Sequence, residues 1–517
     1  MTRADRVYWG LAWLCLALAI PLRLTFFAGF GLGDDPNESL ALINFAHTLR
    51  LDPANFMHYR VVNVVIRGVL YRLFGGHELA FILPVLAFAL GTHAVTMTFA
   101  RDILGARAAF LTSLLFLTTP YETLASTANI PDYFHAFFGA TAGWMAYRGL
   151  RANRPAPMIV AAACVVLAFL NRLSAILLIP PFGVATLVTL RRWRSWTVFW
   201  GAFVAFIGLV CVWDRFHSGD PFRWIFFNAG GLGGYDVTNM LGYVLMVYPR
   251  YLFGRDDLQN FMFGVTGWCA ALGAVVALWR ALRGRAGAGE AVVLIAFFVF
   301  GGMFEFLPHK ITFHSYWSHP RIFRYVAQIS AVVYLCGAYL LDRLWDVPRR
   351  LPVHVGPLLC AGVVAFSLYE TPRVAGPLVD ADRDSRWLVA YLKEHAGPQR
   401  VAVYTDSWRI ALVVSRYDGF HTAWDMHGVG ADSKTDKENF LRTAPAGSLV
   451  VTGGATLPWY SGIDLVLSLS RIEFTVPATW TLLAEYPGKT TPWRAEPMRV
   501  WSVGRPVADG VAGPPTS

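Results

Sequence analysis

Residues 8–36 read YWGLAWLCLALAIPLRLTFFAGFGLGDDP, an apolar run that ends in two adjacent aspartates, Asp34 and Asp35. A run of this length and composition predicts a helix that crosses a membrane. Carboxylates placed beside hydrocarbon are costly and tend to mark a functional site. The sequence therefore predicts a membrane helix with an acidic pair at its outer end.

The whole chain is too apolar for an ordinary soluble protein. Its 517 residues are 55% hydrophobic and 15% charged, with a mean hydropathy of +0.44. We expect about eleven transmembrane helices, because runs of roughly 17–22 apolar residues can span a bilayer. These runs begin near Tyr8, Glu78, Ala106, Tyr133, Pro157, Leu173, Ser195, Phe261, Ala291, Ile322 and Val353. The predicted fold class is a polytopic α-helical membrane protein.

The net charge of +10 reflects membrane topology rather than nucleic-acid binding. Basic residues occupy every gap that faces the cytoplasm if the N-terminus does, as the positive-inside rule predicts. They are Arg3 and Arg6; Arg101 and Arg107; Arg148, Arg151 and Arg154; Arg191, Arg192 and Arg194; Arg280, Arg283 and Arg285; Arg343, Arg349 and Arg350. The first run has no A-x-A-like cleavage site, so we interpret it as an uncleaved anchor.

An odd number of spans places the C-terminal part of the chain on the outer side of the membrane. We therefore divide the chain into a transmembrane domain, residues 1–370, and a soluble periplasmic α/β domain, residues 371–517. The second domain is predicted to contain helices at 384–395 and 407–415, and strands at 400–404, 448–452, 480–485 and 498–503. All six cysteines fall in apolar runs, so no disulfide framework is implied.

Three outer segments are longer or more polar than connectors need to be, and long loops are usually functional. Residues 30–77 contain two amphipathic stretches, 38–49 and 61–74, that are typical of interfacial helices. Residues 214–260 contain a third such stretch at 237–253, and residues 308–321 are rich in polar and aromatic side chains. We expect these segments to cover one shared cavity.

Two acidic positions on the outer side have both a structural and a chemical interpretation. Asp35, Pro36 and Glu38 fit a helix-capping box, whereas Asp34 adds repulsion that a cap does not need. Asp132 opens the fourth run at the same depth, where it is either a helix N-cap or a member of the same site. We take Asp34, Asp35 and Asp132 as the candidate catalytic residues.

Basic residues also gather on the outer side, where the positive-inside rule does not require them. Arginine offers phosphate a bidentate fork and lysine a point charge, so the group indicates anion recognition. The alternative for each is interfacial anchoring or contact with lipid headgroups. His309, His314 and His319 fit no familiar zinc spacing, which favours a structural or substrate-binding role. The group comprises His58, Arg60, Arg172, Lys310, His314, His319, Arg321 and Arg324.

The order of these features resembles the GT-C superfamily of integral-membrane glycosyltransferases, in particular the branch with aminoarabinose transferases and protein O-mannosyltransferases. The resemblance covers roughly the first 345 residues. An acid follows the first span (Asp34-Asp35), and an interfacial stretch ends in Tyr71-Arg72-Leu73-Phe74-Gly75. Residues 101–107, RDILGAR, resemble the second cytoplasmic turn. Asp132, the short paired spans around residues 170–174 (LNRLS) and the pair Arg324-Tyr325 follow in the same order.

By this resemblance, the protein transfers a sugar from a polyprenyl-phosphate carrier to a lipid, glycan or protein acceptor at the periplasmic face of a bacterial inner membrane, with inversion. Asp35 or Asp34 is implied as general base or orienting group, and Asp132 as a group that orients sugar hydroxyls or a basic partner. Donor phosphate contacts are implied for Arg60, Arg172, Lys310, Arg321 and Arg324. Family members often have prolines after the basic residue that precedes the interfacial helix. This chain has none, so either His58 or Arg60 takes that role.

Other interpretations remain open at this point. No cofactor is implied with certainty, and a divalent cation requirement is left open. The membrane lipids are expected partners and nucleic acid is not. A lipid or sugar transporter of the cell envelope would line its pathway with the same charges, although transporters often show inverted repeats and helices broken near the midplane. A membrane-anchored binding protein whose outer domain does the recognition is the third possibility.

Overall fold

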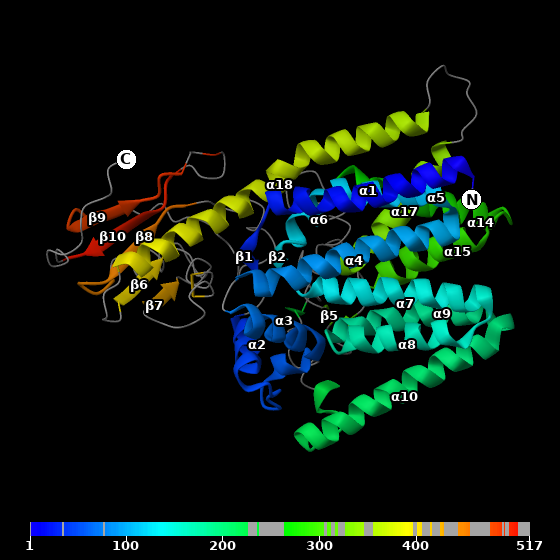
Figure 1. Cartoon of the computed structure of the whole chain (residues 1–517), viewed down its shortest axis with the longest axis horizontal. Helices are drawn as coiled ribbons and strands as arrows, with labels where there is room; N and C mark the ends of the chain where they lie inside the picture. Colours follow the sequence, from blue (N-terminus) through cyan, green and yellow to red (C-terminus); the bar gives the residue numbers. More distant parts are fainter. Residues whose placement is uncertain are drawn as a thin grey trace. The chain divides into compact units, whose positions relative to one another are not determined.

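The computed structural model describes residues 2–33, 36–75, 78–225, 235–236, 263–303, 308–311, 316–318, 326–345, 355–395, 401–405, 414–415, 424–428, 443–454, 476–488, 491 and 496–504. The described chain forms two compact units. The first consists of residues 1–25 and 41–372, and the second of residues 26–40 and 373–517. Figure 1 shows the first unit as helices and the sheet of the second as arrows.

The first unit is a bundle of apolar helices. They are α1 (Arg3–Thr25), α4 (Glu78–Leu104), α5 (Ala106–Thr118), α7 (Asp132–Ala152), α8 (Pro155–Phe169), α9 (Ile179–Val188), α10 (Trp193–Ser218), α14 (Val265–Leu282), α15 (Ala288–Leu294) with the π-helical segment η5 (Ile295–Gly301), and α17 (Ala327–Trp345). Helix α18 (Val355–His395) contributes its first part to this unit. Figure 1 shows α7, α8 and α10 as neighbours, and α17 contacts α5, α7 and α14.

Within the described residues, five helices are long and apolar enough to cross a membrane: α1, α4, the stretch 190–218 around α10, α14 and α18. Four shorter apolar helices accompany them, at 106–118, 155–169, 174–188 and 288–301. The chain is therefore a multi-pass membrane protein, while the count of eleven spans stays a prediction. Gly273 shows how tightly the bundle packs, because any side chain there would collide with the Cys336 carbonyl of α17.

Shorter elements lie between the long helices. They are α2 (Pro36–Thr48), the 3-10 turn η1 (Phe56–Tyr59), α3 (Val61–Phe74), α6 (Pro120–Ala125), β2 (Ala128–Asn129), and the 3-10 segments η2 (Leu173–Leu178) and η3 (Leu190–Arg192). Helices α2 and α3 match the two amphipathic stretches expected in the first outer segment. The third stretch, 237–253, and the Asp35 cap lie outside the described residues.

The second unit contains a mixed five-stranded sheet in the order β7-β6-β8-β10-β9. Its strands are β6 (Val401–Thr405), β7 (Trp424–Gly428), β8 (Leu449–Thr452), β9 (Trp480–Glu485) and β10 (Arg499–Val503). Strand β6 runs parallel to β7 and β8, and β10 runs antiparallel to β8 and β9. Leu388 and Leu392 of α18 pack on one face of this sheet with Val403, Val451 and Val500.

The helix predicted at 384–395 is confirmed. It is the last part of α18, which continues unbroken from Val355 to His395. Residues 382–386 remain helical with Arg386 paired to Asp382 one turn earlier, at 2.7 Å. The helix expected at 407–415 lies mostly outside the described residues.

Candidate functional site

Helix α7, which follows the turn after β2, begins with Asp132, the one candidate acid that the structure describes. The helix begins at Asp132 itself, and Pro131 occupies the N-cap position without a side-chain hydrogen bond. The interpretation of Asp132 as an N-cap is therefore wrong. Its carboxylate instead accepts hydrogen bonds from side chains that lie outside α7.

Asp132 is the centre of a buried polar cluster. Its Oδ1 accepts a hydrogen bond from Arg172 Nη1 at 2.9 Å and another from Gln328 Nε2 at 2.6 Å. Asp132 is 0% exposed, Arg172 5% and Gln328 3%. Buried charges are costly unless they are paired, and here the two formal charges balance. The Oγ of Ser174 donates to Gln328 Oε1 at 3.2 Å and extends the cluster into η2.

Two further side chains, those of Asn171 and Arg67, form hydrogen bonds with residues just before α7. The Asn171 amide donates to the Pro131 carbonyl at 3.2 Å. Arg67 of α3, which is buried, donates to Asn129 Oδ1 and, at 3.0 Å, to Asn63 Oδ1 of its own helix. Helix α3, the turn after α8 and the start of α17 therefore all help to fix the position of Asp132.

Several polar atoms in this cluster are buried without a hydrogen-bond partner among the described residues. They are Asp132 Oδ2, Asn171 Oδ1 and both ring nitrogens of His135. His135 is 0% exposed and lies one turn after Asp132. Its imidazole ring interacts electrostatically with the Arg172 guanidinium. Buried polar atoms in folded proteins almost always have partners, which include ordered water and ligands. These atoms mark the cluster as a place that can accept polar groups of a ligand.

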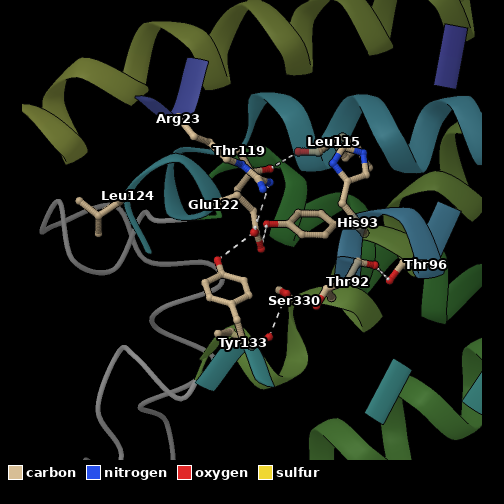
Figure 2. A network of polar contacts seen from close by, with 12 residues as sticks. Arg23, Thr92, His93, Thr96, Leu115, Thr119, Glu122, Leu124, Tyr133 and Ser330 are labelled. Atoms are coloured by element: carbon tan, nitrogen blue, oxygen red, sulfur yellow. Dashed lines mark hydrogen bonds and ion pairs between the residues drawn. The ribbon is translucent and has the colours of Figure 1, made fainter. Parts of the chain in front are cut away.

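A second buried network lies directly beside the first, at Tyr133 (Figure 2). The Tyr133 hydroxyl donates to Glu122 Oε2 at 2.8 Å, and the Tyr334 hydroxyl donates to Oε1 at 3.1 Å. Arg23 Nη2 of α1 lies 3.7 Å from the same carboxylate. Figure 2 shows Arg23, Glu122 and Tyr133 converging from α1, α6 and α7. This network anchors the first residues of α7 and so supports the position of Asp132.

His58 and Arg60 lie at the entry to α3, in the first outer segment. His58 is 2% exposed, and its Nδ1 accepts a hydrogen bond from the Asp52 backbone N–H at 2.5 Å. Arg60 is half-buried and occupies the N-cap position of α3. The contact with Asp52 gives His58 a structural role, and substrate binding by either residue stays a prediction.

The structure predicts that protonation of His58 destabilises this outer segment. Burial lowers the pKa of His58 below its ordinary value of 6.5, against the opposing effect of the Asp52 carboxylate. The unfolded chain therefore binds a proton in the acidic range where the folded chain does not, and stability falls as the pH drops below about 6.5. We expect the melting temperature of the wild type to fall more steeply below this pH than that of His58→Asn. Identical pH profiles would contradict the assignment.

Two outer segments are joined by a small sheet in the order β3-β5-β4. Strand β3 (Tyr235–Asp236) comes from the second segment, and β4 (Pro308–Ile311) and β5 (Tyr316–Ser318) come from the third. Lys310 lies in β4 opposite Trp317. Asp34, Asp35, His314, His319, Arg321, Arg324 and Tyr325 lie outside the described residues. Within the part of the chain that is described, no group of three or more His, Cys, Asp or Glu could hold a metal ion.

An apolar cavity of about 590 Å³ borders the Asp132 cluster. Its wall includes Ala136 and Gly139 of α7 and Gln328 of α17, whose side chain also contacts Asp132. The cavity continues along α7 to Tyr147 and Arg151. A buried polar cluster at one end of a long apolar cavity suits a molecule with a polar head and a hydrocarbon tail.

The comparisons with known proteins agree with this architecture. Residues 61–213 match the family model of dolichyl-phosphate-mannose-protein mannosyltransferases, a range that contains Arg67, Asn129, Asp132 and Arg172. No curated protein sequence matches the chain.

Solved structures match over most of the chain at low sequence identity. ArnT from Cupriavidus metallidurans bound to undecaprenyl phosphate is 18% identical with a TM-score of 0.56, over 98% of this chain and 99% of that one. Its apo form gives a TM-score of 0.51 at 18% identity, over 86% and 92%. The apo oligosaccharyltransferase of Archaeoglobus fulgidus is 12% identical with a TM-score of 0.54, over 86% and 69%. The family model covers less than a third of the chain, and the three solved structures share its fold.

Proposed function

We propose that the protein transfers a sugar from a polyprenyl-phosphate carrier to a lipid, glycan or protein acceptor at the outer face of the membrane, with inversion at the anomeric carbon. The acceptor oxygen forms a bond to that carbon while the bond to the carrier phosphate breaks. The ArnT structure with undecaprenyl phosphate supports a carrier of this chemical class. The observation that carries the proposal is the buried cluster of Asp132, Arg172 and Gln328, of which Asp132 and Arg172 lie inside the family match.

We propose that Arg172 binds the carrier phosphate as it departs from the sugar. The carrier phosphate gains negative charge as the sugar leaves, and a preorganised guanidinium stabilises that charge most effectively in a site shielded from water. Arg172 is 5% exposed, and Asp132 fixes its orientation at 2.9 Å. Since Asp132 acts here through Arg172, we propose it as a positioning residue. This corresponds to the orientation of a basic partner, one of the two roles expected for Asp132.

The acidic pair supplies the second part of the proposed mechanism. If the acceptor is a hydroxyl, Asp34 or Asp35 takes its proton as the new glycosidic bond forms. If the acceptor is already an anionic phosphate, no base is needed, and the acid orients groups and stabilises positive charge on the sugar. His58, Arg60, Lys310, His319, Arg321, Arg324 and Tyr325 are the further donor and acceptor contacts that we propose. The partners are the polyprenyl-phosphate donor, its acceptor and the surrounding lipids.

Arg172→Lys tests the proposed phosphate contact. Lysine keeps a positive charge opposite Asp132, so the buried acid is not left unpaired, but it loses the rigid fork of the guanidinium. We expect kcat/KM for the polyprenyl-phosphate-sugar donor to fall by about 10²–10³-fold, the cost of one lost transition-state donor. The assay measures release of labelled sugar from the donor. Arg154→Lys, an exposed arginine at α8, is the control. Equal kcat/KM for both variants would remove Arg172 from the mechanism.

A further inference from the structure

The apolar cavity extends along most of α7, well beyond the Asp132 cluster. Its wall follows this helix from Ala136 to Arg151. Because an α-helix rises about 1.5 Å per residue, this is a length of about 22 Å. The hydrocarbon core of a bilayer is about 30 Å thick, so a cavity this long suits an extended hydrocarbon chain.

The sequence of α7 explains why this space is open. Ala136, Gly139, Ala140, Gly143 and Ala146 lie on one face of the helix, and all of them border the cavity. In membrane proteins, such small residues usually let a second helix approach closely. Here no backbone fills the face at Gly143, because an added Cβ would meet only the Phe99 ring, at 3.7 Å.

The two ends of the cavity differ in charge. At the Gln328 end, neither Arg172 nor Asp132 borders the cavity, and both ends of the Gln328 amide are hydrogen-bonded. At the other end, Arg151 and Arg192 border the cavity and are exposed. Arg151 donates to the Asp102 carbonyl at 3.3 Å. Neither arginine forms an ion pair with any residue that the structure describes. The positive charge at this end is therefore available to an anion.

We propose that this cavity binds an anionic glycerophospholipid. One acyl chain lies along the small face of α7, and the phosphate lies between Arg151 and Arg192. Guanidinium groups suit phosphate because they donate two parallel hydrogen bonds, and basic pockets between membrane helices are known sites for anionic headgroups. Arg191 and Arg194 satisfy the positive-inside rule equally well, and they do not border the cavity. The rule therefore does not explain why Arg151 and Arg192 border it.

Native mass spectrometry of the delipidated full-length protein, titrated with phosphatidylglycerol, tests this site. The wild type should retain one tightly held phosphatidylglycerol and bind phosphatidylcholine more weakly. Arg151→Gln/Arg192→Gln should weaken phosphatidylglycerol binding by about thirtyfold, or about fivefold for each lost charge. Arg191→Gln/Arg194→Gln is the matched control, because it removes the same charge from the same side, and its affinity should not change.

Gly143→Leu tests the chain-binding part of the cavity, because it fills the wall while both arginines remain. This variant should lose the tightly held lipid at an unchanged melting temperature. If it fails to fold, the arginine variants decide. Equal phosphatidylglycerol affinities of the two double-arginine variants would overturn the proposal. Binding of phosphatidylcholine as tight as that of phosphatidylglycerol would also overturn it, and so would retention of polyprenyl phosphate in place of phosphatidylglycerol. The measurement needs no sugar donor, so its result is independent of the proposed transfer reaction.

Discussion

Asp34→Asn/Asp35→Asn should lower sugar transfer by about 10²–10⁴-fold, the range expected when a general base is lost. Asparagine keeps the size of each side chain but neither accepts a proton nor stabilises positive charge as a carboxylate does. The measurement is the initial rate of transfer of labelled sugar from the polyprenyl-phosphate donor. The single variants then show which carboxylate is responsible, and Asp34→Asn is the cleaner of the two because α2 begins at Pro36, directly after Asp35.

The control for the acidic pair is Asp220→Asn, at an exposed acid within residues 214–260. Its transfer rate should match the wild type. Melting temperatures separate a chemical effect from a folding effect, since loss of an N-cap residue typically costs about 1 kcal/mol. A double variant with full activity would remove the pair from the mechanism.

Asp132→Asn should destabilise the protein by about 3–5 kcal/mol, because it removes the carboxylate that pairs with the buried Arg172 guanidinium at 2.9 Å. Asp132 is 0% exposed, and its carboxylate also accepts the Gln328 hydrogen bond. Asp132→Asn/Arg172→Gln removes both charges, so we expect it to regain most of the lost stability. The free energy of unfolding of the four proteins, measured by denaturant titration in detergent, gives the coupling between the two residues.

Asp342→Asn provides the comparison for the buried pair. Asp342 lies 2.6 Å from Arg107, but their side chains are 14% and 23% exposed. Pairs with access to solvent contribute at most about 1 kcal/mol. Similar losses of unfolding free energy for Asp132→Asn and Asp342→Asn would contradict a strong buried ion pair. Additive effects of the Asp132 and Arg172 substitutions would contradict it as well.

The helices were predictable from sequence because burial in lipid imposes a simple pattern on them. Apolar runs located α1, α4 and α10, and amphipathic spacing gave α3 the bounds 61–74 that the structure shows. Alternating strands were also predicted at β6, β8, β9 and β10. Strand β7 was not predicted, although residues 424–427 (WDMH) alternate apolar and polar side chains. It pairs in parallel with β6. The continuity of α18 between the last apolar run and the helix predicted at 384–395 was missed, because the second half of α18 is polar and has no membrane pattern.

The candidate site was only partly predictable. Asp132 and Arg172 were identified from their outer positions, and the structure brings them within 2.9 Å. Their partner Gln328 carries no local signal, since it lies 196 residues from Asp132. His135 offered one signal, its spacing of three residues from Asp132 on the same helix. Of the two interpretations of Asp132, the N-cap is wrong because a tertiary ion pair engages the carboxylate, which no local pattern reveals.

The central claim, that the protein is a glycosyltransferase with a polyprenyl-phosphate-sugar donor, is tested most directly by one measurement. Membrane extracts containing the wild type are supplied with a panel of polyprenyl-phosphate donors, each with a radiolabelled sugar, and the label is followed into lipid, glycan and protein fractions. The account predicts that label from at least one donor appears in one of these fractions with the wild type and is lost with Asp34→Asn/Asp35→Asn. Absence of transfer from every donor, together with movement of a labelled lipid or sugar across the membrane, would contradict it and indicate a transporter.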